Sequence, residues 1–268
     1  MRFAVISDIH GNLAALEAVL GDIDALEDPV ERIVCAGDVV GLGHEPNAVV
    51  ELLQSREITA VRGNYDDAVA FDRLSSGVDF ANIEEEQADY RAVEWTRRQL
   101  STANMEYLRQ MPKDIRLFPI FRGTGVKRDE LERAQRSQGR DMLIRMAFGN
   151  IGRSAPRRIK KVLVVHGSPR AFNENIRSDS ANSILATIAK AADADLLISG
   201  HSGEAFEHKA TGMTFVGPGA VSGPHALAGH SAYAVVTVTS DLVVEFRRTT
   251  YGAQPSLKTM TDPGPSAD

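Results

Sequence analysis

The chain has a single cysteine, Cys35, and it lacks any long apolar run. One cysteine cannot form an internal disulfide, which excludes the disulfide-held scaffolds of small secreted proteins and favours a reducing compartment. The apolar stretch within MRFAVISDIHGN is too short for a signal peptide or a membrane span. We therefore expect a cytoplasmic protein that has no membrane partner.

An excess of positive charge is also missing. The formal net charge is −6, so the molecule as a whole gives no reason to expect nucleic-acid binding. The charge is nevertheless uneven. Residues 122–161 contain twelve Lys or Arg against four acidic residues, a net charge of +8, which leaves −14 for the rest of the chain.

The remaining composition is that of an ordinary globular protein. Hydrophobic residues make up 43% and charged residues 25% of 268 residues, a length that is sufficient for a full hydrophobic core. We expect one domain over residues 1–250. The tail at 251–268 has no apolar periodicity, which predicts that it is disordered.

Short apolar runs alternate with helical patterns along the chain. Nearly continuous apolar runs predict buried parallel strands at 2–7, 32–36, 58–62, 162–166 and 195–199. Helices are predicted between them at 12–27, 46–54, 86–99, 101–111 and 179–192, with Asn12 and Ser101 as N-caps. Period-two strands follow near 213–216, 232–239 and 242–248. Alternating strands and helices with an antiparallel end predict a layered α/β sandwich.

Polar residues able to bind a metal follow each of the five apolar strands. They are Asp8, His10, Asp38, Asn64, His166 and His201. Because loops at the carboxyl ends of parallel strands converge, we expect these side chains to lie together. Singly, each has a structural explanation: GNYD, for example, also fits a turn before an Asp-capped helix. Their occurrence at five strand ends favours a metal centre, and mixed oxygen and nitrogen donors suit Mn, Fe, Zn or Ni rather than Ca.

The ordered set DIH, GD, GN, HG and GH resembles the calcineurin-like metallophosphoesterase superfamily. SDIHGN, GDVVGLG and VHGSP look most like its small bacterial and archaeal phosphodiesterase branch, and the resemblance covers residues 1–111 and 162–240. It implies an α/β four-layer sandwich of two mixed β-sheets flanked by helices. It also implies a metal-dependent phosphodiesterase, in which a hydroxide between two divalent ions, Mn²⁺ being favoured, attacks phosphorus. Asp8 and His10 would hold the first ion and Asp38 would bridge both, while the second ion would be held by Asn64, His166 and His201.

Two positions depart from the family pattern. Tyr65 stands where the family usually has the histidine of GNH, and the unperturbed pKa of a tyrosine makes it a poor proton donor at neutral pH. We expect Tyr65, and His44 in GLGHEPN, to contact the substrate, and the missing acid favours diesters. Gly203 replaces the second histidine of GHxH, so the first ion should be held more weakly unless Glu204 or His208 reaches it. These departures keep open a non-catalytic or weakly active binding scaffold, as in the retromer subunit that resembles these enzymes.

A basic helical insertion at about 119–160 is an addition to the family's short form. It is either an exposed helix that could also mediate a homo-oligomer, or a basic lid that attracts an anionic substrate. Nucleic acid is not favoured, because aromatic residues do not alternate with the basic ones along the segment. We expect the substrate to be a small or nucleotide-like phosphate ester.

Overall fold

A computed structural model of the chain describes residues 1–119, 161–224, 226, 228–239 and 241–252. The predicted basic insertion at 119–160 and the predicted tail at 251–268 lie outside these ranges, apart from their first residues. Within the described ranges, none of the helices combines the length and the apolar character that crossing a bilayer requires.

The strands form two mixed five-stranded sheets. The first has the order β10-β9-β1-β2-β3 and consists of β1 (Arg2–Ile6), β2 (Arg32–Cys35), β3 (Thr59–Ala60), β9 (His230–Val238) and β10 (Leu242–Thr250). In it β1, β2 and β3 are parallel, and β9 and β10 are antiparallel to their neighbours. On β1, Val5 lies opposite Val34 of β2 and Ala234 of β9.

The second sheet is also mixed, with three parallel strands in the centre and an antiparallel strand at each edge. Its order is β4-β5-β6-β8-β7, from β4 (Asp114–Leu117), β5 (Val162–Val165), β6 (Leu196–Ser199), β7 (Ala205–Ala210) and β8 (Met213–Pro218). Strands β5, β6 and β8 are parallel, while β4 and β7 are antiparallel edge strands.

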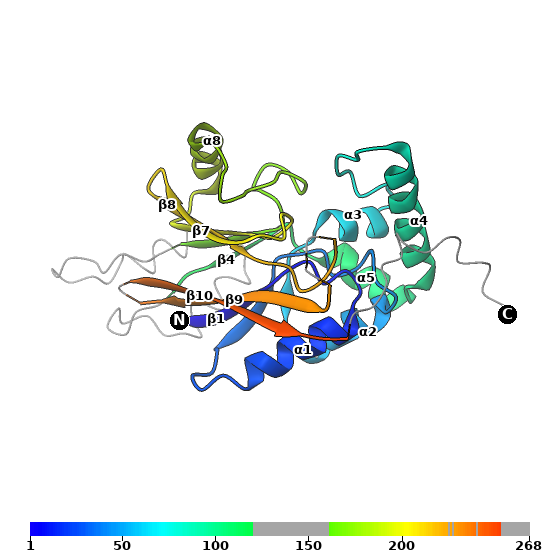
Figure 1. Cartoon of the computed structure of the whole chain (residues 1–268), viewed down its shortest axis with the longest axis horizontal. Helices are drawn as coiled ribbons and strands as arrows, with labels where there is room; N and C mark the ends of the chain where they lie inside the picture. Colours follow the sequence, from blue (N-terminus) through cyan, green and yellow to red (C-terminus); the bar gives the residue numbers. More distant parts are fainter. Residues whose placement is uncertain (120–160, 225, 227, 240, 253–268) are drawn as a thin grey trace.

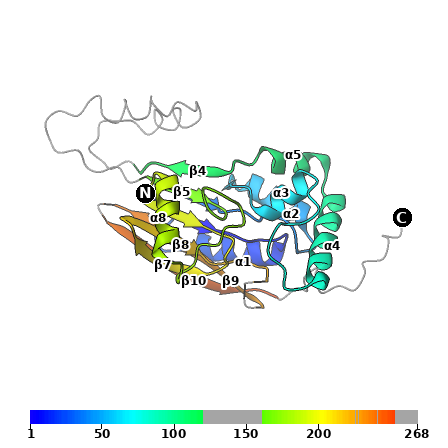
Figure 2. The same ribbon diagram turned by 90° about the horizontal axis from the view of Figure 1, so that it is seen from above.

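Four layers result from the alternation of side chains along the central strands. Phe3 and Val5 point into a core shared by the two sheets, whereas Ala4 and Ile6 point into a second core beneath helices. The helices over the first sheet are α1 (Leu13–Asp24), α2 (Pro46–Ser55), α4 (Ile83–Gln99) and α5 (Thr102–Gln110). Helix α8 (Asn182–Ala192) covers the second sheet, on the opposite side of the molecule from α1 (Figure 1; Figure 2). The predicted four-layer sandwich is confirmed.

Most predicted elements are present, with shifted ends. Asn12 and Ser101 cap α1 and α5 as predicted, each accepting a backbone N–H three residues later. The strand predicted at 58–62 is only two residues long, because the Arg62 N–H donates to the carbonyl of Pro112 (2.8 Å) instead of continuing the ladder. Helix α3 (Asn64–Ala70) follows directly. Strands β4 and β7 were not predicted, since each places few apolar side chains in the core.

Candidate metal centre

The six predicted ligands meet where the strands of both sheets end. Asp8 and His10 follow β1, Asp38 follows β2, and Asn64 begins the helix after β3. His166 and His201 follow β5 and β6 of the other sheet. All six side chains are buried, with exposed fractions between 1% and 8%. The shared end of the two sheets therefore forms one polar site enclosed by the fold.

The backbone at this site is held in an unusual conformation. Asp8, His10, Asp38 and His201 have φ angles of 56°, 51°, 51° and 61°, in the left-handed region that residues with a side chain seldom adopt. Cross-loop hydrogen bonds fix this geometry: the Asp8 N–H donates to Gly37 O (3.0 Å) and the His10 N–H to Asp38 O (2.9 Å). Strain of this kind clusters at functional sites, because surrounding contacts must enforce it.

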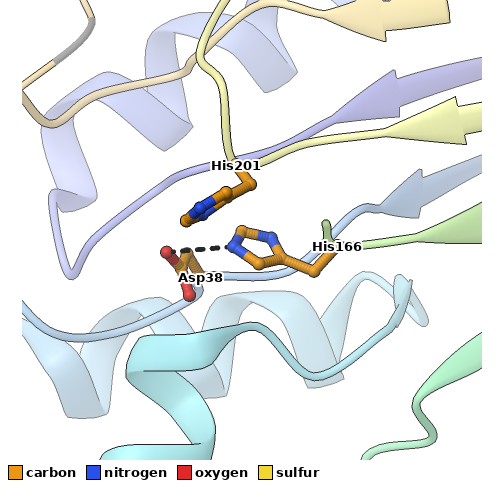
Figure 3. Close-up of side chains that lie close together, drawn as sticks. All are labelled: Asp38, His166 and His201. Carbon is orange, nitrogen blue, oxygen red and sulfur yellow. Dashed lines mark ion pairs between the residues drawn. The ribbon is translucent and has the colours of Figure 1, made fainter. Parts of the chain in front are cut away.

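The ligand atoms form two groups that share Asp38. One comprises Asp8, His10 and Asp38 and the other Asp38, His166 and His201, with ligand atoms within 4.8 Å of one another in each group. Figure 3 shows the second group, in which Asp38 Oδ2 lies 3.3 Å from His166 Nε2. The same oxygen is 3.9 Å from His10 Nε2 in the first group. Asp38 thus belongs to both groups, and its bridging of two ions stays a prediction.

His166 and Asn64 are oriented by their other hydrogen bonds. His166 Nδ1 donates to the carbonyl of Ala36 (2.8 Å), which turns Nε2 toward the site, 2.8 Å from Asn64 Oδ1. The Asn64 amide nitrogen donates to the carbonyl of Ser76 (3.2 Å), so its oxygen faces His166. Nε2 therefore faces oxygen acceptors, and a proton or a metal ion is required between them.

The titration of the buried groups reflects this crowding. The pKa of Asp8 is raised to about 7, mainly by burial, with the positive charge of His166 opposing the shift and the charge of Asp38 adding to it. Burial also raises the pKa of Asp38, but the positive charge and hydrogen bond of His166 outweigh burial and lower this pKa to about 2. Burial would lower the pKa of His166, yet Asp38 raises it to about 9. Without a metal ion the site thus retains a proton on His166, which a bound cation would displace.

A divalent cation fits this arrangement. Asp8 Oδ2 is buried and accepts no hydrogen bond from any described residue, which is rare for a carboxylate oxygen and common for a metal ligand. Carboxylate, amide and imidazole donors are the set that Mn, Fe, Zn and Ni share. At Gly63 the chain passes so close to Asp38 Oδ1 that a Cβ would collide with it, so a glycine is required there.

Asp66 was not predicted as a site residue, and it ties two ligand loops together. Its carboxylate accepts N–H bonds from Gly63 (2.9 Å), Val39 (2.9 Å) and Val40 (3.1 Å). Burial, with the charge of Asp38 added, raises its pKa to about 7. Helix α3 begins at Asn64 with Gly63 as its N-cap, so Asp66 lies within the first turn rather than at the N-cap position that the sequence indicated for Asp. Its bonds to Val39 and Val40, in the loop after β2, join residues that are 27 and 26 positions apart in the sequence. No local sequence pattern predicts contacts of that range.

Of the two predicted substrate contacts, Tyr65 packs against a candidate ligand and His44 packs against Trp95. The Tyr65 ring meets the His10 ring edge-on at 5.0 Å, and its hydroxyl donates to Asp89 Oδ1 (2.5 Å). Burial raises the pKa of Tyr65 well above its usual value, and the charge of Asp89 adds to this. The His44 ring packs against Trp95 at 5.8 Å. Contact of either residue with a substrate stays a prediction.

Neither residue that could have replaced the missing histidine completes the first group. Glu204 accepts hydrogen bonds from the N–H (3.3 Å) and the hydroxyl of Ser178, and His208 lies on β7. Among the described residues, neither belongs to a group of converging ligand atoms. Gly203 itself has a φ of 64°, so its backbone is also left-handed. The first group is therefore formed by Asp8, His10 and Asp38.

Comparisons with known proteins point to one family. A model of the calcineurin-like phosphoesterase superfamily domain matches residues 1–241. A metallophosphoesterase from Sphaerobacter thermophilus is similar in structure, with 26% identity, a TM-score of 0.59, and 94% of this chain and 89% of that one covered. The hypothetical protein PH1004 from Pyrococcus horikoshii shares the fold at 20% identity, with a TM-score of 0.65 and coverage of 93% and 88%. The uncharacterized protein MJ0912 of Methanocaldococcus jannaschii is 38% identical over 109 residues, and the match spans 41% of either chain.

Proposed function

The chain belongs to the calcineurin-like phosphoesterase superfamily, and we propose that it is a metal-dependent phosphodiesterase with two divalent transition-metal ions, Mn²⁺ foremost, at this site. The observation that carries the proposal is the sharing of Asp38 by two groups of ligand atoms. Two ions about 3.5–4 Å apart need such a shared anion. The proposed substrate is a small or nucleotide-like phosphate ester.

Each ligand has a distinct role in this proposal. Asp8 and His10 would hold one ion and His166 and His201 the other, Asp38 would be shared by both, and Asn64 would be a neutral oxygen ligand beside His166. When bound, the ions supply an acidified water as nucleophile and neutralise the charge that grows on the phosphoryl oxygens. The chain itself orients the donors, through the left-handed loops and the Ala36 carbonyl on His166, and excludes bulk water by burying them.

A preference for diesters with good leaving groups follows from the side chains beside the ligands. The Tyr65 hydroxyl is a weaker acid than usual and already donates to Asp89, while the His44 ring packs against Trp95. A Tyr65 hydroxyl in this state is poorly suited to protonating a departing alkoxide, a step that contributes roughly 10²–10⁴-fold. Aryl diesters, whose leaving groups are weak bases, should be cleaved well, and alkyl monoesters poorly.

A series of esters tests this proposal. We expect Mn²⁺-loaded protein to hydrolyse aryl phosphodiesters with a kcat/KM that falls steeply as the leaving-group pKa rises. Tyr65→His should selectively improve substrates with poor leaving groups. A shallow dependence that Tyr65→His leaves unchanged would show that another group protonates the leaving oxygen, and His44→Ala is then the next variant to measure. If no ester is turned over at saturating Mn²⁺, the protein is a binding scaffold and not an enzyme.

A further inference from the structure

Asp89 is a fully buried carboxylate that does not belong to either ligand group. It lies on α4 with an exposed fraction of 0%. Its carboxylate accepts hydrogen bonds from the Tyr65 hydroxyl (2.5 Å), the Ser76 N–H (2.8 Å) and the Ser76 hydroxyl (2.9 Å). Full burial of a carboxylate carries a desolvation cost, so a function for its placement is expected.

Ser76 and Tyr65, which donate hydrogen bonds to Asp89, each contact ligands of the proposed centre. The carbonyl of Ser76 accepts the Asn64 amide N–H (3.2 Å), and Asn64 Oδ1 lies 2.8 Å from His166 Nε2. The ring of Tyr65 packs on His10, and its backbone N–H donates to Asp38 Oδ1 (2.9 Å). One carboxylate thus reaches ligands of both groups through one intervening residue each.

The contact through Ser76 has a specific chemical consequence. An asparagine amide presents an oxygen on one side and an NH₂ group on the other, and only the oxygen can ligate a cation. A carbonyl accepts only from the NH₂ group, so Ser76 O selects the orientation in which Oδ1 faces His166. Asp89 binds both the N–H and the hydroxyl of Ser76, which fixes the position of that carbonyl.

We propose that Asp89 is a positioning residue for the metal centre, acting through Ser76 to hold the Asn64 oxygen toward the ion and through Tyr65 to hold the His10 ring. The inference rests on the proposed function, because it requires that the site bind metal. Outer hydrogen bonds of this kind typically change metal affinity by roughly 10–100-fold. A purely structural Asp89 would instead affect folding stability and leave the affinity of the folded protein unchanged.

Asp89→Asn tests this directly, with Mn²⁺ affinity of metal-stripped protein measured by titration calorimetry and its folding by urea denaturation. We expect a loss of roughly 10–100-fold at the ion that Asn64 contacts. The matched control is Asp22→Asn, because Asp22 on α1 also accepts a tyrosine hydroxyl, that of Tyr233 (2.6 Å), on the outer helix layer. It should bind Mn²⁺ as the wild type does.

Coupling to Asn64 separates positioning from folding. In an Asn64→Ala background, Asp89→Asn should cause little further loss in affinity at that ion, since the oxygen it positions is absent. Tyr65→Phe removes one donor to Asp89 but keeps the ring on His10, so we expect it to lower Mn²⁺ affinity by less than Asp89→Asn does. If Asp89→Asn does not fold, the affinity of Tyr65→Phe tests the positioning role instead.

The outcomes distinguish this inference from the proposed function. Wild-type affinity in both folded variants, or in Tyr65→Phe when Asp89→Asn does not fold, would overturn the positioning role and leave the metal centre intact. An equal loss in the presence and absence of the Asn64 side chain would also overturn it. A wild-type protein that binds no Mn²⁺ would overturn both.

Discussion

At the scale of single residues, the notable feature is that four of the candidate ligands have a left-handed backbone conformation. A left-handed residue with a Cβ costs roughly 1–2 kcal/mol, and Asp8, His10, Asp38 and His201 each adopt this conformation. Hydrogen bonds between neighbouring loops hold it in place. The local backbone therefore sets the positions of these candidate ligands.

Removing the shared carboxylate should abolish metal-dependent hydrolysis. Asp38→Ala deletes the only anion that lies in both ligand groups of the described chain, so neither ion keeps its full set of ligands. The measurement is kcat/KM for an aryl diester over a range of Mn²⁺ concentrations. Full activity in this variant would rule out a pair of ions sharing Asp38.

Because Gly203 provides no ligand atom, we expect the protein to bind one of the two ions more weakly than the other. In the wild type we expect titration calorimetry to resolve a tight ion at Asn64, His166 and His201 and a weaker one at Asp8 and His10. Gly203→His should increase the affinity for the weaker ion if the new imidazole ring reaches that ion. Because φ at Gly203 is 64°, the substitution should also lower the free energy of unfolding by roughly 1–2 kcal/mol.

Gly203→Ala is the control for that experiment, because it introduces the backbone strain without a ligand. It should lose the same stability and leave both metal affinities as they are. Two equally tight ions in the wild type would show that Gly203 does not weaken the first group.

At the scale of elements, Asp66 joins α3 to the loop that follows β2. Asp66 on the first turn of α3 satisfies three backbone N–H groups from two ligand loops. Asp66→Ala leaves these donors without their acceptor, at about 1–3 kcal/mol each, so we expect a loss of at least about 3 kcal/mol in urea denaturation of the metal-free protein. Its neighbour Asp67 is the control: it pairs with Arg62 (3.2 Å) and Arg73 (3.3 Å), and Asp67→Ala should cost less. Equal losses would show that the loop contacts of Asp66 add nothing.

The sequence predicted the central strands and the ligands for one physical reason. Parallel strands covered on both faces must be continuously apolar, and the polar residues that follow them stand out against that background. Edge strand β7 was not predicted, because its side chains are mostly exposed or half-buried. Asp89 was not predicted as a site residue, because Ser76 and Tyr65, which bind it, lie 13 and 24 residues away, on a loop and on α3. Contacts of that range have no periodicity to reveal them.

At the scale of the whole molecule, charge is divided between one segment and the rest. Residues 122–161 carry +8 and the remaining chain −14. If the basic segment attracts an anionic substrate, replacing residues 124–155 by a short linker should raise KM and flatten its dependence on salt, because screening acts over about 8 Å at physiological ionic strength. The check is KM measured from low to high salt in both proteins. An unchanged salt profile would favour a structural or oligomeric role for the segment.

The most direct test of the metal centre is to titrate metal-stripped protein with Mn²⁺ and to measure bound ions per chain and aryl-diester turnover in the same samples. The account predicts that turnover stays near its baseline while the first ion binds, rises as the second binds, and does not rise in Asp38→Ala. Full turnover with one ion per chain, or none with two, would contradict it.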